Sequence, residues 1–241
     1  MRDAGIARCG HLWQTVNMES PGPGQVKFRG RSPIGHPMIP LPPNPEKESV
    51  CGVILTGGKS LRMGLNKAFL NIQGQPMVVR SAAHLAAVTD EILISSNDPA
   101  PYEVLGLPVI PDLYPGQGPL AGLHAAMAHT RRSLVLLLAC DLPRIHSGML
   151  ARLIHGAPGF DAVVPRTTDE RVHPLCAVYR RTCFKHIEAN LVCLKNKMVA
   201  FLENPSLKVN WLEPAEGSFV DEDLINLNSP NDLEAYLASL R

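Results

Sequence analysis

The chain has 241 residues, of which 45% are hydrophobic and 19% are charged, and its formal net charge at pH 7 is +1. A chain of this length and apolar content can bury one sizeable core, which favours a globular protein of one or two domains. The near-neutral charge excludes a global basic field for nucleic acid, and an aromatic content of only 5% argues against a stacking platform for single strands.

The six cysteines are irregularly spaced, without a C-x-x-C pair or a zinc-type spacing. This pattern favours free thiols over a disulfide or a metal–thiolate site. No apolar stretch approaches the length of a membrane span, and no apolar region follows a basic start as in a secretory signal. We therefore expect a reduced, soluble protein of the cytoplasm, with neither membrane nor nucleic acid as a partner.

Residues 1–48 differ from the rest of the chain because prolines and glycines crowd a stretch with little periodicity. Such a stretch cannot bury enough apolar surface to offset its ordering entropy, so we expect a disordered or loose tail. Docking of this segment to a partner as polyproline II is the less favoured alternative. Translation could also start downstream, at Met18 or Met38. Residues 49–241 are expected to form the folded domain.

Apolar runs alternate with helical patterns throughout the expected domain. Strands are expected at 50–55, 91–95, 107–111, 134–139, 160–165, 172–179 and 207–212. Helices are expected from Pro76 to about residue 87, from Pro119 to about 131, over 146–155, within 182–202, and from Pro230 to about 240 with Ser229 as its N-cap. This alternation without an internal repeat indicates an α/β fold, a doubly wound and mostly parallel sheet sandwiched by helices.

A glycine-rich stretch directly follows the first expected strand. Paired glycines let backbone amides approach a ligand closely and adopt φ > 0, and such amides form an anion-binding concavity. The cations downstream would pair with a chain of phosphates, so the whole stretch suits a nucleoside triphosphate. The glycines alone could equally form an ordinary strand-to-helix turn. The residues of this stretch are Leu55, Thr56, Gly57, Gly58, Arg62, Met63, Gly64 and Lys67.

The full pattern Leu-x-Gly-Gly-x-x-x-Arg-Met-Gly-x-x-Lys resembles the signature of nucleotidyltransferases, and in detail it looks like that of molybdenum cofactor guanylyltransferases. The resemblance covers residues 50–241, with one departure at Thr56, where the family usually has Ala. It implies a Rossmann-like nucleotidyltransferase fold and an enzyme that transfers GMP from GTP to the phosphate of molybdenum-molybdopterin, releasing pyrophosphate. Transient contact with enzymes that receive the cofactor is also implied.

Two alternatives stay open beside this interpretation. A related nucleotidyltransferase could use CTP or another phosphorylated acceptor, because a motif does not fix base choice. A non-catalytic nucleotide- or cofactor-binding protein is the alternative from a different class. Pure binding would not require Arg62, Lys67 and Asp141 together, which favours the enzyme.

Asp141 follows the most apolar run of the chain and is therefore expected at the carboxyl end of a central strand, where ligands bind in open α/β sheets. A carboxylate there would hold Mg²⁺, a hard cation that prefers a few oxygens plus substrate phosphates. The resemblance likewise assigns metal binding to the aspartate of Cys140-Asp141-Leu142-Pro143. The purely structural alternative is a turn residue or a helix N-cap.

The resemblance also implies roles for the remaining candidate residues. The catalytic group would comprise Arg62, Lys67 and Asp141, with the two cations neutralising charge on the leaving pyrophosphate. The nucleotide would contact Leu55, Thr56, Gly57, Gly58, Lys67, Asn97, Asp112 and Asp141. The acceptor side would be lined by His173, Asn226 and Asn228. The loop 118–122 would border the base or the phosphates. Asn and Asp are also common turn formers, and a lone His is more often structural than catalytic.

Overall fold

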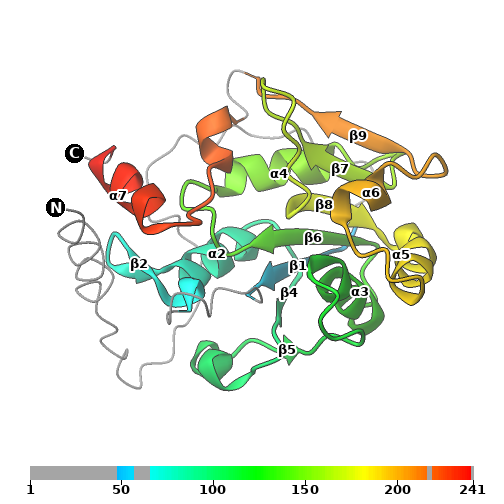
Figure 1. Ribbon diagram of the computed structural model, residues 1–241, viewed down its shortest axis with the longest axis horizontal. Coiled ribbons are helices and arrows are strands. Elements are labelled where there is room, and N and C mark those ends of the chain that lie inside the picture. The colour runs from blue at the N-terminus through cyan, green and yellow to red at the C-terminus, as the bar shows by residue number, and fades with distance from the viewer. Residues whose placement is uncertain (1–47, 57–65, 216–218, 240–241) are drawn as a thin grey trace, which may run out of the picture.

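The computed structural model describes residues 48–56, 66–215 and 219–239. In this part of the chain a central sheet lies between two layers of helices (Figure 1). Apart from residue 48, the expected tail lies outside the described residues. Gly57, Gly58 and Arg62 of the glycine-rich stretch also lie outside them.

The central sheet has seven strands and runs mostly in one direction. Its strands are β1 (Val50–Leu55), β4 (Glu91–Ser95), β5 (Val109–Ile110), β6 (Leu134–Ala139), β7 (Ala162–Pro165), β8 (Cys176–Arg180) and β9 (Val209–Leu212). They lie in the order β5-β4-β1-β6-β8-β7-β9. Only β8 is antiparallel to its neighbours, β6 and β7, so the expected doubly wound, mostly parallel sheet is confirmed.

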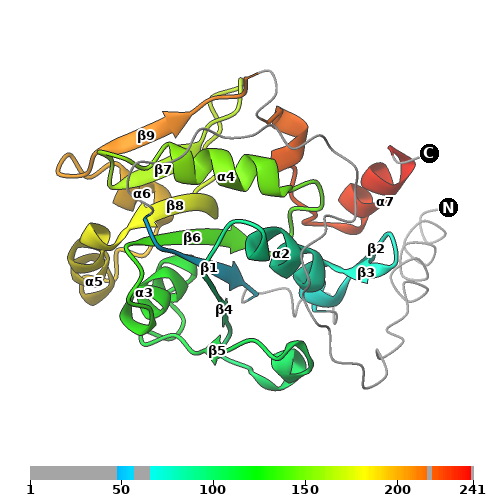
Figure 2. The same ribbon diagram turned by 180° about the vertical axis from the view of Figure 1, so that it is seen from behind.

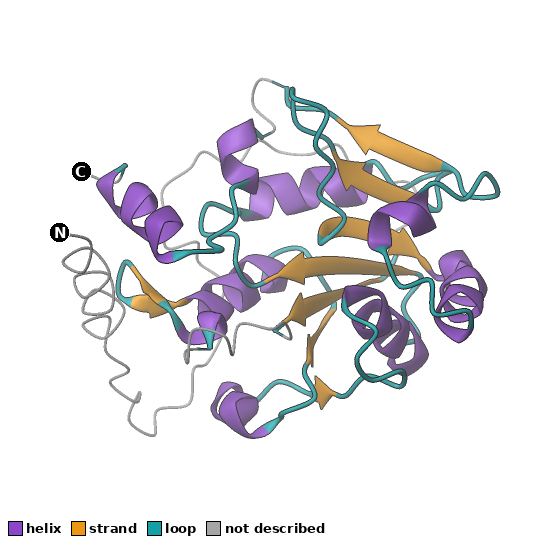
Figure 3. Cartoon of the chain, in the orientation of Figure 1, coloured by secondary structure: helices purple, strands orange, loops and turns teal. Residues whose placement is uncertain are grey.

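The helices follow the expected order (Figure 3), and the elements differ from expectation in two details, one in a helix and one in a strand. The α-helices are α2 (Met77–Ala86), α3 (Pro119–His129), α4 (Ser147–His155), α5 (Phe184–Val192), α6 (Met198–Leu202) and α7 (Pro230–Ala238). The segment expected to be helical over 182–202 is divided, because Leu194 adopts a φ of 57° just after α5. The strand expected from 172 starts only at Cys176, since Pro174 has no N–H to donate to a ladder.

Short elements complete the described structure. They are the 3₁₀ helices η2 (Lys67–Phe69), η3 (Ala100–Leu105), η4 (Arg181–Cys183) and η5 (Asp221–Leu224), and a separate antiparallel hairpin of β2 (Asn71–Ile72) and β3 (Gln75–Pro76). None of the helices in the described ranges has the length and apolar character needed to cross a membrane.

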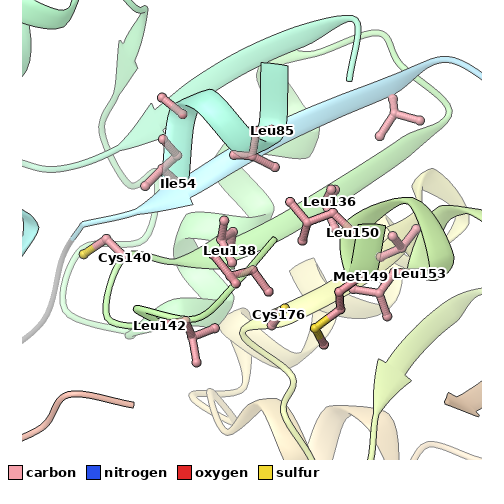
Figure 4. Close-up of a cluster of buried hydrophobic side chains, with 14 of the residues drawn as sticks. Ile54, Leu85, Leu136, Leu138, Cys140, Leu142, Met149, Leu150, Leu153 and Cys176 are labelled. Carbon is pink, nitrogen blue, oxygen red and sulfur yellow. The ribbon is translucent and has the colours of Figure 1, made fainter. Parts of the chain in front are cut away.

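The two faces of the sheet support separate hydrophobic cores. Every residue of β1 and β6 is buried, which agrees with their continuous apolar sequences. Within β6, Leu136 and Leu138 belong to the first core, while Val135 and Leu137 belong to the second. Helices α2 and α4 cover the first core, shown in Figure 4 with Leu85 of α2, and α3, α5 and α6 cover the second (Figures 1 and 2).

A third, smaller core joins two segments that are distant in sequence. Helix α7 and the hairpin β2–β3 lie at the same end of the molecule (Figures 1 and 2). Buried apolar side chains from both segments form this core, so α7 is fixed to the chain directly after Lys67. Its buried members are Leu70, Ile72, Met77, Leu227, Leu233 and Tyr236.

Helix α3 approaches the sheet so closely that one of its positions has no room for a side chain. A Cβ atom added to Gly122 would lie 2.7 Å from both Leu55 Cδ2 and Ser95 Oγ. Real Cβ atoms do not reach such distances, so Gly122 sets the spacing between α3 and the ends of β1 and β4.

Replacing Gly122 by Ala should therefore lower the free energy of unfolding by about 1–3 kcal/mol, because the added methyl must displace the buried side chains of Leu55 and Ser95. Denaturant unfolding measures this loss. Gly148→Ala in α4 is the matched control, since its added Cβ would lie 3.2 Å from a side-chain atom, His146 Nδ1, and should cost less. Equal losses in both variants would contradict the close-approach argument.

Candidate active site

Four candidate residues, each following one of four parallel strands, lie along one edge of the central sheet. Strands β1, β4, β5 and β6 are mutually parallel neighbours, so their carboxyl ends meet at this edge. The residues that follow these strands are Thr56, Asn97, Asp112 and Asp141. Because β8 runs the opposite way, its start lies there too, and Ala139 N–H donates to the carbonyl of Leu175 at 2.7 Å. This places the chain around His173 at the same edge.

The entry to the glycine-rich stretch is fixed to both neighbouring strands. Thr56 donates to the carbonyl of Ser95 twice, from its backbone N at 3.2 Å and from its Oγ1 at 3.0 Å. On the other side, the carbonyl of Leu55 accepts from the backbone N–H of Cys140 at 3.2 Å. The hydroxyl of Thr56 thus adds a hydrogen bond that an Ala at this position would lack.

Lys67 begins the short helix η2 and extends its side chain to the C-terminal part of the chain. Its Nζ donates to the backbone carbonyl of Asn228 at 2.9 Å. The preceding residue, Asn66, caps η2 by accepting from Ala68 N–H at 3.1 Å. Asn66 Nδ2 also donates to the hydroxyl of Tyr102 at 2.9 Å. Sequence reasoning missed Asn66 and Tyr102, although an Asn directly before a short apolar segment is a recognisable cap signal.

The carboxylate of Asp141 is desolvated at this edge and lacks a full set of hydrogen-bond partners within the described part of the chain. Its Oδ1 is buried and has no hydrogen-bond partner among the described residues. Burial raises the pKa of the Asp141 carboxyl above its usual range, and the nearby charge of Lys67 opposes this rise without cancelling it. A buried carboxylate oxygen with free lone pairs fits a bound cation, which would restore the charge balance lost on burial.

The described residues contain no group of three or more His, Cys, Asp or Glu side chains that could enclose a metal ion. A divalent cation held by the carboxylate of Asp141 could take further ligands from substrate phosphates and water. This is the mode of binding that Mg²⁺ favours, since it dehydrates reluctantly and commonly uses only one or two protein carboxylates. The donor at Asp141 is thus consistent with Mg²⁺ held jointly by protein and substrate.

Asn97 and Asp112 form a reciprocal pair beyond the ends of β4 and β5. Asn97 Nδ2 donates to Asp112 Oδ2 at 2.9 Å, and Asp112 N–H donates to Asn97 Oδ1 at 2.9 Å. Each side chain thus fixes the other, and a carboxylate has further lone pairs for additional donors. The pair presents oriented polar groups at the exposed surface of the same edge.

The residues expected on the acceptor side include two unpaired buried polar atoms. His173 Nε2 and Asn226 Oδ1 have no hydrogen-bond partner within the described ranges. Burial, with help from the charge of Arg171, lowers the pKa of His173, so its imidazole is neutral at neutral pH. Next to Asn226, Leu227 N–H donates to the carbonyl of Asp141 at 2.9 Å, which joins this segment to the strand end.

Gln117 is a further candidate that sequence reasoning missed. Its Oε1 is buried without a partner among the described residues. The residue lies between Gly116 and Gly118, whose φ angles of 78° and 70° require glycine. Only the flanking glycines were visible in the sequence as a turn signal, and they do not reveal which way the amide between them points.

Cys140, directly before Asp141, does not serve as a nucleophile in this environment. Burial, together with the charge of Asp141, raises the pKa of the Cys140 thiol to about 12. The thiolate is the reactive form, so at neutral pH this residue is an inert thiol within the apolar core.

Comparison with known proteins shows the family to which this chain belongs. The profile of a family described as the MobA-like NTP transferase domain matches residues 52–207. The molybdenum cofactor guanylyltransferase of Desulfosudis oleivorans is 32% identical over 199 residues, which cover 80% of this chain and 97% of that protein. A protein of Pelotomaculum thermopropionicum, named as a probable molybdenum cofactor guanylyltransferase, is 37% identical over 185 residues, covering 76% and 89%.

Solved structures share the architecture. The molybdopterin-guanine dinucleotide biosynthesis protein A of Archaeoglobus fulgidus has a TM-score of 0.64 at 22% identity, covering 79% of this chain and 100% of that one. The 2-C-methyl-D-erythritol 4-phosphate cytidylyltransferase of Thermus thermophilus has a TM-score of 0.59 at 16% identity, covering 78% and 98%. At such identities these likenesses establish the fold, which is that of nucleotidyltransferases.

The raised pKa of Asp141 makes a prediction about the ligand-free protein. The folded chain holds this proton more tightly than the unfolded chain, so the wild type loses stability as pH rises from the ordinary aspartate pKa through the raised folded value. Asp141→Asn removes this penalty and should be more stable than the wild type at neutral pH. The gain should grow through that pH window and stay constant above it.

Thermal unfolding from about pH 3 to about pH 8, with a chelator present, measures the effect. If Asp141 were only a turn or helix-cap residue, the stability of the Asn variant would instead match that of the wild type across the range, because Asn caps a helix as well as Asp does.

Proposed function

Because the chain belongs to the MobA-like NTP transferase family, we propose that it is a Mg²⁺-dependent guanylyltransferase of molybdenum cofactor synthesis. It transfers GMP from GTP to the phosphate of molybdenum-molybdopterin, which yields the guanine dinucleotide form of the cofactor and pyrophosphate. The names and high coverage of the relatives support the choice of base and acceptor. The observation in this chain that carries the proposal is the unpaired, buried carboxylate oxygen of Asp141 beside Lys67.

In this proposal GTP binds across the carboxyl ends of β1, β4 and β5. The stretch after Thr56 would contact the phosphates through the amides of Gly57 and Gly58. The reciprocal pair of Asn97 and Asp112 would contact the nucleoside, with the remaining lone pairs of the carboxylate free to accept from its hydroxyl groups. Mutual fixation of the two side chains reduces the entropy lost when the nucleotide binds.

The reaction needs positioning and charge neutralisation more than covalent help from the protein. An oxygen of the acceptor phosphate forms a bond to the α-phosphorus of GTP, while the bond from that phosphorus to the β-phosphate oxygen breaks and pyrophosphate leaves. Lys67 and Arg62 would neutralise the charge that develops on the pyrophosphate. Mg²⁺ bound at Asp141 would neutralise and orient the phosphates of both substrates.

The acceptor would bind on the other side of Asp141. The unpaired Nε2 of His173 and Oδ1 of Asn226 are polar atoms that a ligand rich in hydrogen-bonding groups could satisfy. A neutral imidazole can donate or accept at Nε2, so His173 is suited to orientation of the acceptor rather than to charge pairing.

We also propose that the protein acts in the cytoplasm. The irregular spacing of its cysteines favours free thiols, and the cytoplasm keeps thiols reduced. The product would pass to recipient enzymes through transient contacts, because a stable complex would remove the transferase from further turnover.

Base choice is the direct test of the proposed function. Pyrophosphate release should be fastest with GTP among the four nucleoside triphosphates, and it should require both molybdopterin and Mg²⁺. A preference for CTP would assign the chain to a related transferase. Nucleotide binding without pyrophosphate release under any condition would assign it to the non-catalytic alternative.

Lys67→Ala should lower turnover about 100- to 1,000-fold, since removal of one group that stabilises developing charge typically costs this much. Steady-state pyrophosphate release with GTP and molybdopterin measures the loss. Lys208→Ala is the matched control, because Lys208 is exposed and precedes β9 at the opposite edge of the sheet. Comparable losses in the two variants would refute a specific role for Lys67.

A further inference from the structure

The first turn of α7 is hydrogen-bonded to the backbone that holds Lys67. Asp232 Oδ2 accepts from the backbone N–H of Asn228 at 2.8 Å and from that of Ser229 at 2.7 Å. The carbonyl of Asn228 in turn accepts from Lys67 Nζ at 2.9 Å. The carboxylate of Asp232 is thus linked to the ammonium group of Lys67 through the backbone of residues 228–229. Lys67 lies 161 residues from Asn228 in sequence.

The geometry of the peptide bond makes this connection stiff. The carbonyl of Asn228 and the N–H of Ser229 belong to one planar peptide unit and point in opposite directions. When Asp232 holds the N–H of Ser229, it therefore also fixes the direction of the Asn228 carbonyl. That carbonyl is the acceptor for Lys67, so rotation of the peptide unit would remove the contact.

The same segment is also hydrogen-bonded to the backbone of Asp141. Leu227 N–H donates to the carbonyl of Asp141 at 2.9 Å, and the Leu227 side chain is buried in the small core with Leu70 and Leu233. Residues 227–229 thus lie between Asp141 and Lys67 and are held from both sides. Burial acts to raise the pKa of Asp232, but the hydrogen bonds from Asn228 and Ser229, aided by the charge of Lys67, keep this pKa below its usual range.

We propose that Asp232 is a positioning residue for the transfer reaction: by fixing the peptide unit between Asn228 and Ser229, it holds the ammonium group of Lys67 near Asp141. This inference rests on the proposed function for the role of Lys67 in turnover. The placement of Lys67 itself does not depend on that function and can be measured separately. The second residue of the cap, Ser229, supplies the control: its hydroxyl accepts from Asp232 N–H at 3.2 Å, and its removal leaves the Asp232 carboxylate in place to accept from both backbone N–H groups.

The placement of Lys67 is tested by its rate of reductive methylation, followed site by site by mass spectrometry in the full-length protein. Asp232→Ala removes the acceptor for both backbone N–H groups, so Lys67 should be methylated faster than in the wild type. Asp232→Asn keeps an acceptor and should restore the slow rate. Ser229→Ala breaks the other half of the cap and should also leave the rate slow. An unchanged rate in Asp232→Ala would overturn the inference.

Turnover then separates positioning from a general loss of stability. Asp232→Ala should lower kcat about 10- to 100-fold, the loss typical of a small misplacement of a catalytic group. Ser229→Ala, with a similar fall in Tm, should keep its kcat. In the Lys67→Ala background, Asp232→Ala should cause no further loss, because its effect acts through Lys67. Equal losses of kcat in the two cap variants, or additive losses in the double variant, would show a merely structural role.

The two proposals fail in different ways. If the wild type transfers no GMP but Asp232→Ala alone still accelerates methylation of Lys67, the proposed function fails and the positioning stands. If the wild type is active and Asp232→Ala changes neither methylation nor kcat, the positioning fails and the function stands.

Discussion

The parallel pairing of β1 with β4 on one side and β6 on the other is the constraint on which the site depends. Parallel neighbours have their carboxyl ends at one edge, so residues that are far apart in sequence are brought to the same edge by the pairing of their strands. Thr56 and Asp141 follow the ends of two strands that are paired along their whole length, from Val50 with Leu134 to Leu55 with Ala139. The chemistry of the edge follows from that register, since a slip of one residue would turn every buried side chain to the other face.

Burial gives this edge its electrostatic character. Asp141 follows a completely apolar strand and is adjacent to the buried Cys140, so its carboxylate pays a desolvation cost that Lys67 offsets only in part. The unpaired atoms of Gln117, His173 and Asn226 are further polar groups held with incomplete partners. Such groups are costly in a structural core but useful where a charged ligand completes the hydrogen bonds and neutralises the charge.

Much of the fold could be predicted from local sequence. Continuous apolar runs identified β1, β4 and β6, and Ser229 with Pro230 marked the start of α7 correctly. Other features depend on contacts that local patterns do not encode. The reversed direction of β8 is set by pairing with β6 and β7, and the positive φ of Leu194 that ends α5 carries no glycine signal. The role that we propose for Asp232 was invisible for the same reason, since the sequence indicates a helix cap but not that Lys67 binds the carbonyl of the adjoining Asn228.

The contact between Lys67 and Asn228 has a consequence for the order in which the protein is made. Residues 50–139 can pair β1, β4, β5 and β6 with one another while the ribosome is still translating the rest of the message. The Asn228 carbonyl that accepts from Lys67, and the half of the small core that packs on Leu70, Ile72 and Met77, become available only when residues 227–238 have emerged. A nascent chain can therefore pair four parallel strands of its sheet before the Asn228 carbonyl is available to Lys67.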